Sequence, residues 1–225
     1  LTIWETCMRT TPVQFIYLLL FTFSCLFVNA QESVSVQVNL NDAESHAVEN
    51  AVIIFTPTFS APAVSEQNQT PAIMNQIDKQ FAPHVLVVQA GRFIAFPNAD
   101  NLFHHVYSFS PAKQFELKLY KEFTAEPLRF DEPGIVDIGC NIHDWMLGYI
   151  VVTESPYFIK TDTHGKAQID LPAGEYALSF WHPRAKDATP FSQNTMVFDT
   201  SKTLSLQLDT VIENDLGFDD GFGEY

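Results

Sequence analysis

Short runs of alternating apolar and polar residues recur along this chain of 225 residues, and no stretch carries sustained helical periodicity. Residues 33–40, 176–181 and 203–208 all alternate in this way. A period of two places every second side chain on the same face, so each run predicts a half-buried β-strand. Polar turns, such as residues 41–45, and a Pro-containing linker at residues 60–70 separate the runs. The sequence therefore predicts an all-β fold.

The composition is that of a globular protein with a hydrophobic core, at 46% hydrophobic and 17% charged residues. Lys and Arg number 12 against 27 for Asp and Glu, which gives a formal net charge of -15. Because the phosphates of nucleic acids require cationic contacts, this charge argues against nucleic acid as a partner. It favours a partner with a basic docking face.

The first 30 residues have the layout of a secretory signal peptide. Residues 8–11 form a short basic region, residues 15–28 are almost wholly apolar, and residues 28–30 form a small-x-small cleavage site. We interpret residues 1–7 as doubtful start-site sequence. The apolar run is too short and too poorly flanked for a membrane span. We expect export to the periplasm with no stable span after cleavage; an uncleaved N-terminal anchor is the alternative.

Four residues have the chemistry of a metal site. Cys140, His143 and Met146 share one short segment with the spacing C-x2-H-x2-M, and His104 lies far upstream after an Asn/Asp-rich turn. One thiolate, two imidazoles and a weak axial thioether are the ligands of a mononuclear blue-copper site. We therefore predict one copper ion bound by these four residues. Zinc is the alternative metal because Cys and His also suit it, but Met is a poor zinc ligand.

Cysteine usage supports the same prediction. Cys7 and Cys25 lie in the predicted signal peptide, so the exported protein keeps only Cys140. We expect the protein to be sent to an oxidising compartment, where a chain with one cysteine cannot form an internal disulfide. A free thiol is a liability there unless something occupies it, and copper ligation is a good physical reason for it.

The strands around these residues resemble those of the cupredoxins, the family of plastocyanin and pseudoazurin. Residues 81–98 are similar to the approach to the first ligand strand, residues 128–140 to the strands that deliver the thiolate, and residues 148–152 to the closing strand. The short ligand loop looks most like that of amicyanin. The resemblance covers residues 71–153 and implies a Greek-key β-sandwich that transfers electrons.

The flanking residues resemble a second fold. Residues 156–210 look like part of a carboxypeptidase-regulatory-like, or transthyretin-like, β-sandwich, and residues 31–64 look like its opening strands. We expect the cupredoxin domain to be inserted into this sandwich; alternatively, the opening strands only decorate the cupredoxin. Residues 211–225 are expected to form an acidic tail. The overall layout resembles so-called methylamine utilization proteins, a family label that identifies no substrate.

Three neighbours of the predicted ligands are expected to tune the site. His105 stands where cupredoxins usually have Asn, and Asn141 stands where Ser or Thr is common. In the family these two positions tie the ligand loops together by a hydrogen bond, and both side chains here donate and accept. We expect His104 inside the ligand set and His105 outside it; the reverse is the alternative, since adjacent strand residues face opposite sides. Asp144 is expected to lower the reduction potential and to favour protonation of His143 in the Cu(I) state.

The nearby aromatic residues divide into two groups. We expect Phe103 and Tyr107 to lie in the core. Trp145 is either an exposed part of a docking patch beside His143 or a core plug, and the sequence favours neither.

The resemblance implies an exported electron carrier whose partners are redox proteins such as a c-type cytochrome, an oxidase or a dehydrogenase. We expect no enzymatic activity, because copper oxidases and reductases need further copper centres and the chain has only seven histidines. Two alternatives remain open. One is a protein that buffers or delivers copper, although the Met- and His-rich pattern of such proteins is missing. The other is a cell-envelope interaction module in which copper is structural.

Overall fold

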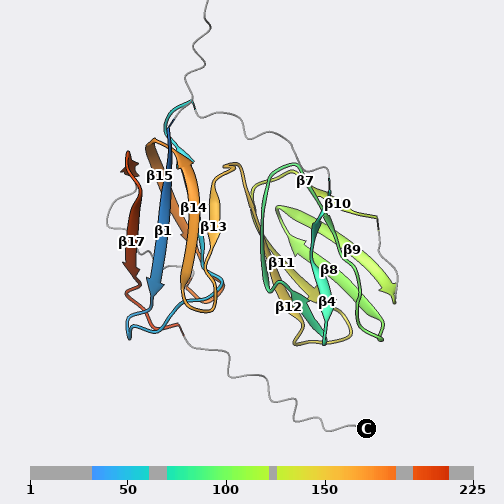
Figure 1. Cartoon of the computed structure of the whole chain (residues 1–225). Coiled ribbons are helices and arrows are strands. Elements are labelled where there is room, and N and C mark those ends of the chain that lie inside the picture. Colours follow the sequence, from blue (N-terminus) through green and yellow to red (C-terminus); the bar gives the residue numbers. More distant parts are fainter. Residues whose placement is uncertain (1–31, 61–69, 122–125, 186–194, 213–225) are drawn as a thin grey trace, which may run out of the picture. The chain divides into compact units, whose positions relative to one another are not determined.

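The computed structural model describes residues 32–60, 70–121, 126–185 and 195–212 (Figure 1). The predicted signal peptide and almost all of the predicted acidic tail lie outside these ranges. Every regular element in the described ranges is a β-strand, and the seventeen strands form five sheets. The prediction of an all-β fold is therefore confirmed. Within the same ranges, no helix has the length and apolar character that crossing a membrane requires.

One pair of sheets combines strands from the beginning and the end of the described chain (Figure 1). The first sheet has the order β14 (Lys166–Pro172), β1 (Ser33–Asn41) and β17 (Lys202–Gln207). The second has the order β13 (Phe158–Lys160), β2 (Val52–Pro57), β15 (Gly174–Trp181) and β16 (Thr195–Phe198). Strand β1 is antiparallel to β14 and parallel to β17.

These two sheets share one hydrophobic core. The alternation of β1 sends every second side chain into this core, namely Val34, Val36, Val38 and Leu40. The rings of Phe55 and Tyr176 pack edge to face within it, and the Tyr176 hydroxyl donates to the Pro172 carbonyl oxygen at 2.7 Å. Burial raises the pKa of Tyr176 to about 12. The predicted domain boundaries and the kinship of this part with regulatory-like sandwiches remain predictions.

The part of the chain between β2 and β13 forms three further sheets. The largest has the order β6 (Val85–Gln89), β12 (Leu147–Thr153), β11 (Gly134–Cys140), β8 (His104–Ser110) and β9 (Lys113–Tyr120). A second sheet has the order β10 (Leu128–Phe130), β7 (Arg92–Ala95) and β3 (Ala72–Ile73). A short hairpin consists of β4 (Asn75–Ile77) and β5 (Gln80–Ala82).

The register of the five-stranded sheet brings two distant parts of the sequence together. Strand β8 begins at His104 and its antiparallel neighbour β11 ends at Cys140, which is paired with Val106. His104 and Cys140 therefore lie at the same end of the sheet, although 36 positions separate them in the sequence. The apolar core beneath this end includes Val106, Ile138 and Cys140.

Candidate metal centre

Three potential metal donors converge at this end of the sheet. One donor atom each from His104, Cys140 and His143 lies within 4.8 Å of the others. Nδ1 of His104 is 3.6 Å from Cys140 Sγ, and Nδ1 of His143 is 3.7 Å from the same sulfur. Cys140 is 3% exposed, His104 is fully buried and His143 is half-buried. In the part of the chain that the structure describes, no other His, Cys, Asp or Glu side chains form such a group of three.

These separations fit one bound metal ion. Metal–sulfur and metal–nitrogen bonds in proteins are about 2.3 and 2.1 Å long, so two donors on one ion are separated by less than about 4.4 Å. Both sulfur–nitrogen distances are below that limit. A thiolate with two imidazoles is a donor set that suits copper, and zinc also accepts it.

The ligand loop is a tight turn that its own main chain closes. The Cys140 N–H donates to the Met146 carbonyl oxygen at 3.2 Å, and the Met146 N–H donates to the His143 carbonyl oxygen at 2.9 Å. Met146 is 2% exposed and packs in the same hydrophobic cluster as Cys140. The loop therefore places the methionine in the core beside the cysteine, while its role as an axial ligand remains a prediction.

Asp100, which the sequence pattern did not single out, contacts the ring nitrogen of His104 that does not lie near Cys140. The Asp100 carboxylate oxygen Oδ2 lies 2.8 Å from Nε2 of His104. The same carboxylate accepts the N–H groups of Asp78 at 2.7 Å and Lys79 at 2.9 Å. The Asn/Asp-rich turn before His104 was visible in the sequence, but its hydrogen-bond partners lie about twenty residues away and carry no sequence signal.

Asn98 gives this turn its shape. Its Nδ2 donates to the carbonyl oxygens of Leu102 at 2.8 Å and Tyr120 at 3.0 Å. Its Oδ1 accepts the Asp100 N–H at 2.9 Å. These hydrogen bonds hold the turn against the end of β9, and the Asp100 carboxylate then lies next to the buried His104.

The side chains of His105 and Asn141 lie outside the group of donor atoms. Nε2 of His105 is 2.8 Å from Glu116 Oε1 on the neighbouring strand, and Asn141 is exposed. The two positions are nevertheless joined, because the Asn141 N–H donates to the His105 carbonyl oxygen at 2.9 Å. The tie that we expected between side chains is thus made by the main chain, which does not depend on the identity of either residue.

The exposed edge of the group is formed by His143 and its neighbours. Partial burial lowers the pKa of His143, and the charges of His104 and Lys79 act in the same direction, whereas Asp100 opposes them. Asp144 is exposed. Trp145 is 47% exposed, with its ring 5.5 Å from that of His143, so it is a surface residue and not a core plug.

Apolar side chains near this edge remain exposed. Phe103 is 52% exposed, so the prediction that it lies in the core is wrong: it precedes β8 in a loop and no strand turns it inward. Tyr107 is only half-buried, with its ring over Gly139. Other large apolar residues that are exposed and close in sequence to the donor residues are Leu102 and Ile142, in loops, and Leu147, the first residue of β12.

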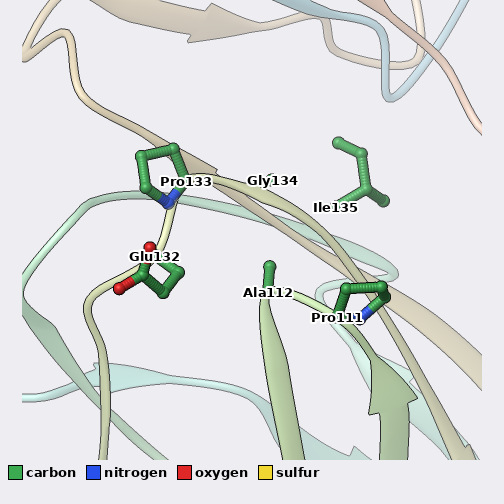
Figure 2. Close-up of a pocket in the computed structure, with 6 residues that line it drawn as sticks. All are labelled: Pro111, Ala112, Glu132, Pro133, Gly134 and Ile135. Carbon is green, nitrogen blue, oxygen red and sulfur yellow. The ribbon is translucent and has the colours of Figure 1, made fainter.

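A shallow hollow lies at the other end of β8 and β11 (Figure 2). It is lined by Pro111, Ala112, Glu132, Pro133, Gly134 and Ile135. Strand β11 begins at Gly134 and ends at Cys140, so the length of the strand separates the hollow from the donor atoms. The hollow is therefore not part of the metal centre.

Comparison with known proteins identifies likenesses in structure only. No family model matches the chain, and no curated protein matches it. A reduced amicyanin variant shares 23% identity over 44% of this chain and 98% of its own, with a TM-score of 0.34. A Cu-containing nitrite reductase from Thermus scotoductus shares 22% identity over 44% of this chain and 25% of its own, with a TM-score of 0.37. At these values neither likeness carries an inference about function, which depends on the site itself.

Proposed function

We propose that this chain is an exported blue-copper protein that carries single electrons between redox partners. The copper ion would be held by His104, Cys140, His143 and the axial Met146. The observation that carries this proposal is the approach of two imidazole Nδ1 atoms to one buried thiol, at 3.6 and 3.7 Å. Copper in such a site alternates between Cu(I) and Cu(II), which supplies one-electron chemistry without a bond being made in a substrate.

The protein's own residues support rapid electron transfer by limiting rearrangement. His104 is the first residue of β8 and Cys140 the last residue of its neighbour β11, so the sheet anchors both side chains. The main-chain hydrogen bonds of residues 140–146 hold His143 and Met146 in the same turn. A donor set that is already assembled changes little when the charge of the ion changes.

The surroundings of His143 support docking of a redox protein. This histidine is half-buried, and exposed apolar side chains, including Trp145 and Phe103, lie on the adjoining loops. Exposed apolar patches rimmed by polar residues are typical of protein interaction sites. The proposed partner is a redox protein such as a c-type cytochrome, an oxidase or a dehydrogenase. A basic docking face on it would complement the net charge of -15.

The burial of the site favours electron transfer over copper delivery. Cys140, His104 and Met146 are 3%, 0% and 2% exposed, so an acceptor protein has no direct access to three of the four proposed ligands. An electron, in contrast, can leave through the half-buried His143. The inserted arrangement of the cupredoxin-like segment, its periplasmic address and the absence of enzymatic activity belong to the same proposal.

The visible absorption spectrum during titration with Cu(II) tests the proposal. We expect an intense blue band from thiolate-to-copper charge transfer that a mild reductant bleaches and that Cys140→Ser abolishes. His104→Gln and His105→Gln form a matched pair, of which only the first should remove the band. A protein that binds zinc but shows no blue band with Cu(II) would overturn the proposal, and handover of Cu(I) to a chelator within seconds would favour delivery.

A further inference from the structure

Asp100 connects the buried histidine to a hairpin turn. Its carboxylate lies 2.8 Å from Nε2 of His104 and accepts the N–H groups of Asp78 and Lys79 at 2.7 and 2.9 Å. Asp78 and Lys79 form the turn between β4 and β5, and both have a positive φ, of 53° and 58°. This backbone conformation is uncommon for residues other than glycine, and here it directs two successive N–H groups at one carboxylate. The Asp100 side chain therefore joins its own turn to the β4–β5 turn and to the start of β8.

The two main-chain hydrogen bonds at Asp100 indicate which nitrogen of His104 carries its proton. The N–H groups of Asp78 and Lys79 donate to one carboxylate oxygen each, so both oxygen atoms of Asp100 act as hydrogen-bond acceptors. An ionised carboxylate only accepts hydrogen bonds, so Nε2 of His104 must be the donor. Nδ1 is then left with its lone pair, and it is this atom that lies 3.6 Å from Cys140 Sγ.

We propose that Asp100 is a positioning residue of the metal centre, which holds the proton of His104 on Nε2 and directs Nδ1 to the copper ion. This inference rests on the proposed function. A carboxylate behind a metal-bound imidazole fixes its tautomer and raises its basicity. The side chain of Asp100 is only 11% exposed, so water screens its charge weakly. Its negative charge therefore also favours Cu(II) over Cu(I), and it lowers the reduction potential.

The tautomer can be measured without copper. Nitrogen-15 NMR of the metal-free protein should show His104 with its proton on Nε2, in slow exchange with solvent because the side chain is fully buried. In Asp100→Ala the two tautomers should both be populated, because the acceptor of the Nε2 proton is gone. A proton on Nδ1 in the wild-type protein would overturn the inference, whether or not any variant folds.

Copper affinity and potential provide the second test. We expect the Cu(II) dissociation constant to rise about 10- to 100-fold in Asp100→Ala. The reduction potential should rise in Asp100→Asn, and a tenfold loss of preference for Cu(II) corresponds to about 59 mV for one electron. Asp131→Asn is the matched control. It removes the same charge from an exposed residue paired with Arg129, and it lies beyond the far end of β11 from Cys140.

The outcomes separate this inference from the proposed function. A wild-type protein without a blue band overturns the proposed function, while the tautomer of the metal-free protein still decides whether Asp100 orients His104. A blue wild-type protein in which Asp100→Asn and Asp131→Asn have the same potential and affinity overturns the inference alone. A changed potential in Asp100→Asn together with an unchanged one in Asp131→Asn supports both.

Discussion

Gly148 lies directly against Phe81, and a Cβ atom at Gly148 would be 2.9 Å from Phe81 Cβ. Phe81 is 3% exposed and packs in the core that also contains Cys140 and Met146. Gly148 follows the ligand loop by two residues, at the start of β12. The close approach of strand and ring therefore helps to position the loop.

Gly148→Ala should destabilise the protein by about 1–3 kcal/mol, the usual cost of overpacking a core. The contact is with a Cβ atom, which can move only if the backbone of β5 moves. Urea unfolding of the metal-free protein measures the effect. Gly139→Ala is the control: its new Cβ would meet Cζ and the hydroxyl of Tyr107 at 3.1 Å, at the mobile end of a half-buried side chain. Equal losses in the two variants would contradict this explanation.

His182 should make the fold sensitive to acid. Its Nε2 lies 3.1 Å from the Glu49 carbonyl oxygen and its Nδ1 accepts the Arg184 N–H at 3.2 Å, an arrangement that needs a neutral ring. Burial, with the charges of Arg184 and His84, lowers the pKa of His182 to about 4. The unfolded chain binds a proton near pH 6.5, so the stability from this residue is complete above pH 6.5 and is lost as the pH falls toward 4.

The loss from His182 amounts to up to about 3 kcal/mol between those limits. Urea unfolding of the metal-free protein at several pH values measures it. His182→Asn should be less stable at pH 7 and lose less stability on acidification than the wild type. His164→Asn, in an exposed turn, should leave the pH dependence unchanged. The same slope in all three proteins would refute the assignment.

Asp144→Asn should raise the reduction potential of the copper-loaded protein. Asp144 is exposed and adjacent in sequence to His143, and removal of its negative charge disfavours the more highly charged Cu(II) state. Because water screens an exposed charge, the shift should be smaller than that of Asp100→Asn. Voltammetry at low ionic strength measures both, with Asp131→Asn as the reference. An unchanged potential in Asp144→Asn would show that this charge does not reach the site.

Trp145→Ala should slow electron exchange with the partner and leave the protein itself intact. The side chain is 47% exposed, so its removal should change stability by less than about 0.5 kcal/mol and preserve the blue band. If Trp145 anchors the docked complex, the second-order rate constant with a c-type cytochrome should fall about tenfold or more. Stopped-flow kinetics measures this rate. Val197→Ala, on β16 and 51% exposed, is the control, and an equal effect there would exclude a specific docking role.

Local patterns were sufficient to predict several of the strands. The alternation of residues 33–40 depends only on successive side chains, and β1 covers that segment with every second residue buried. The prediction for Phe103 failed for a related reason: the apolar character of one residue does not reveal whether a strand or a loop contains it. Its neighbour His104 begins β8, and this one-position difference decides that the histidine is buried and the phenylalanine exposed.

The sequence by itself determined the all-β class, because side-chain alternation is a property of neighbouring residues. It also predicted a metal site in residues 140–146, since three of the proposed ligands share one turn. Only the tertiary structure decided the hydrogen bonds of Asp100, the residue that contacts His104. Its carboxylate accepts the N–H groups of Asp78 and Lys79, which are distant in sequence and come close through chain folding. The same holds for the pairing of β1 with β14 and β17, which are far away in sequence. Such contacts depend on which distant segments come together, and the alternation within one strand does not identify its partner.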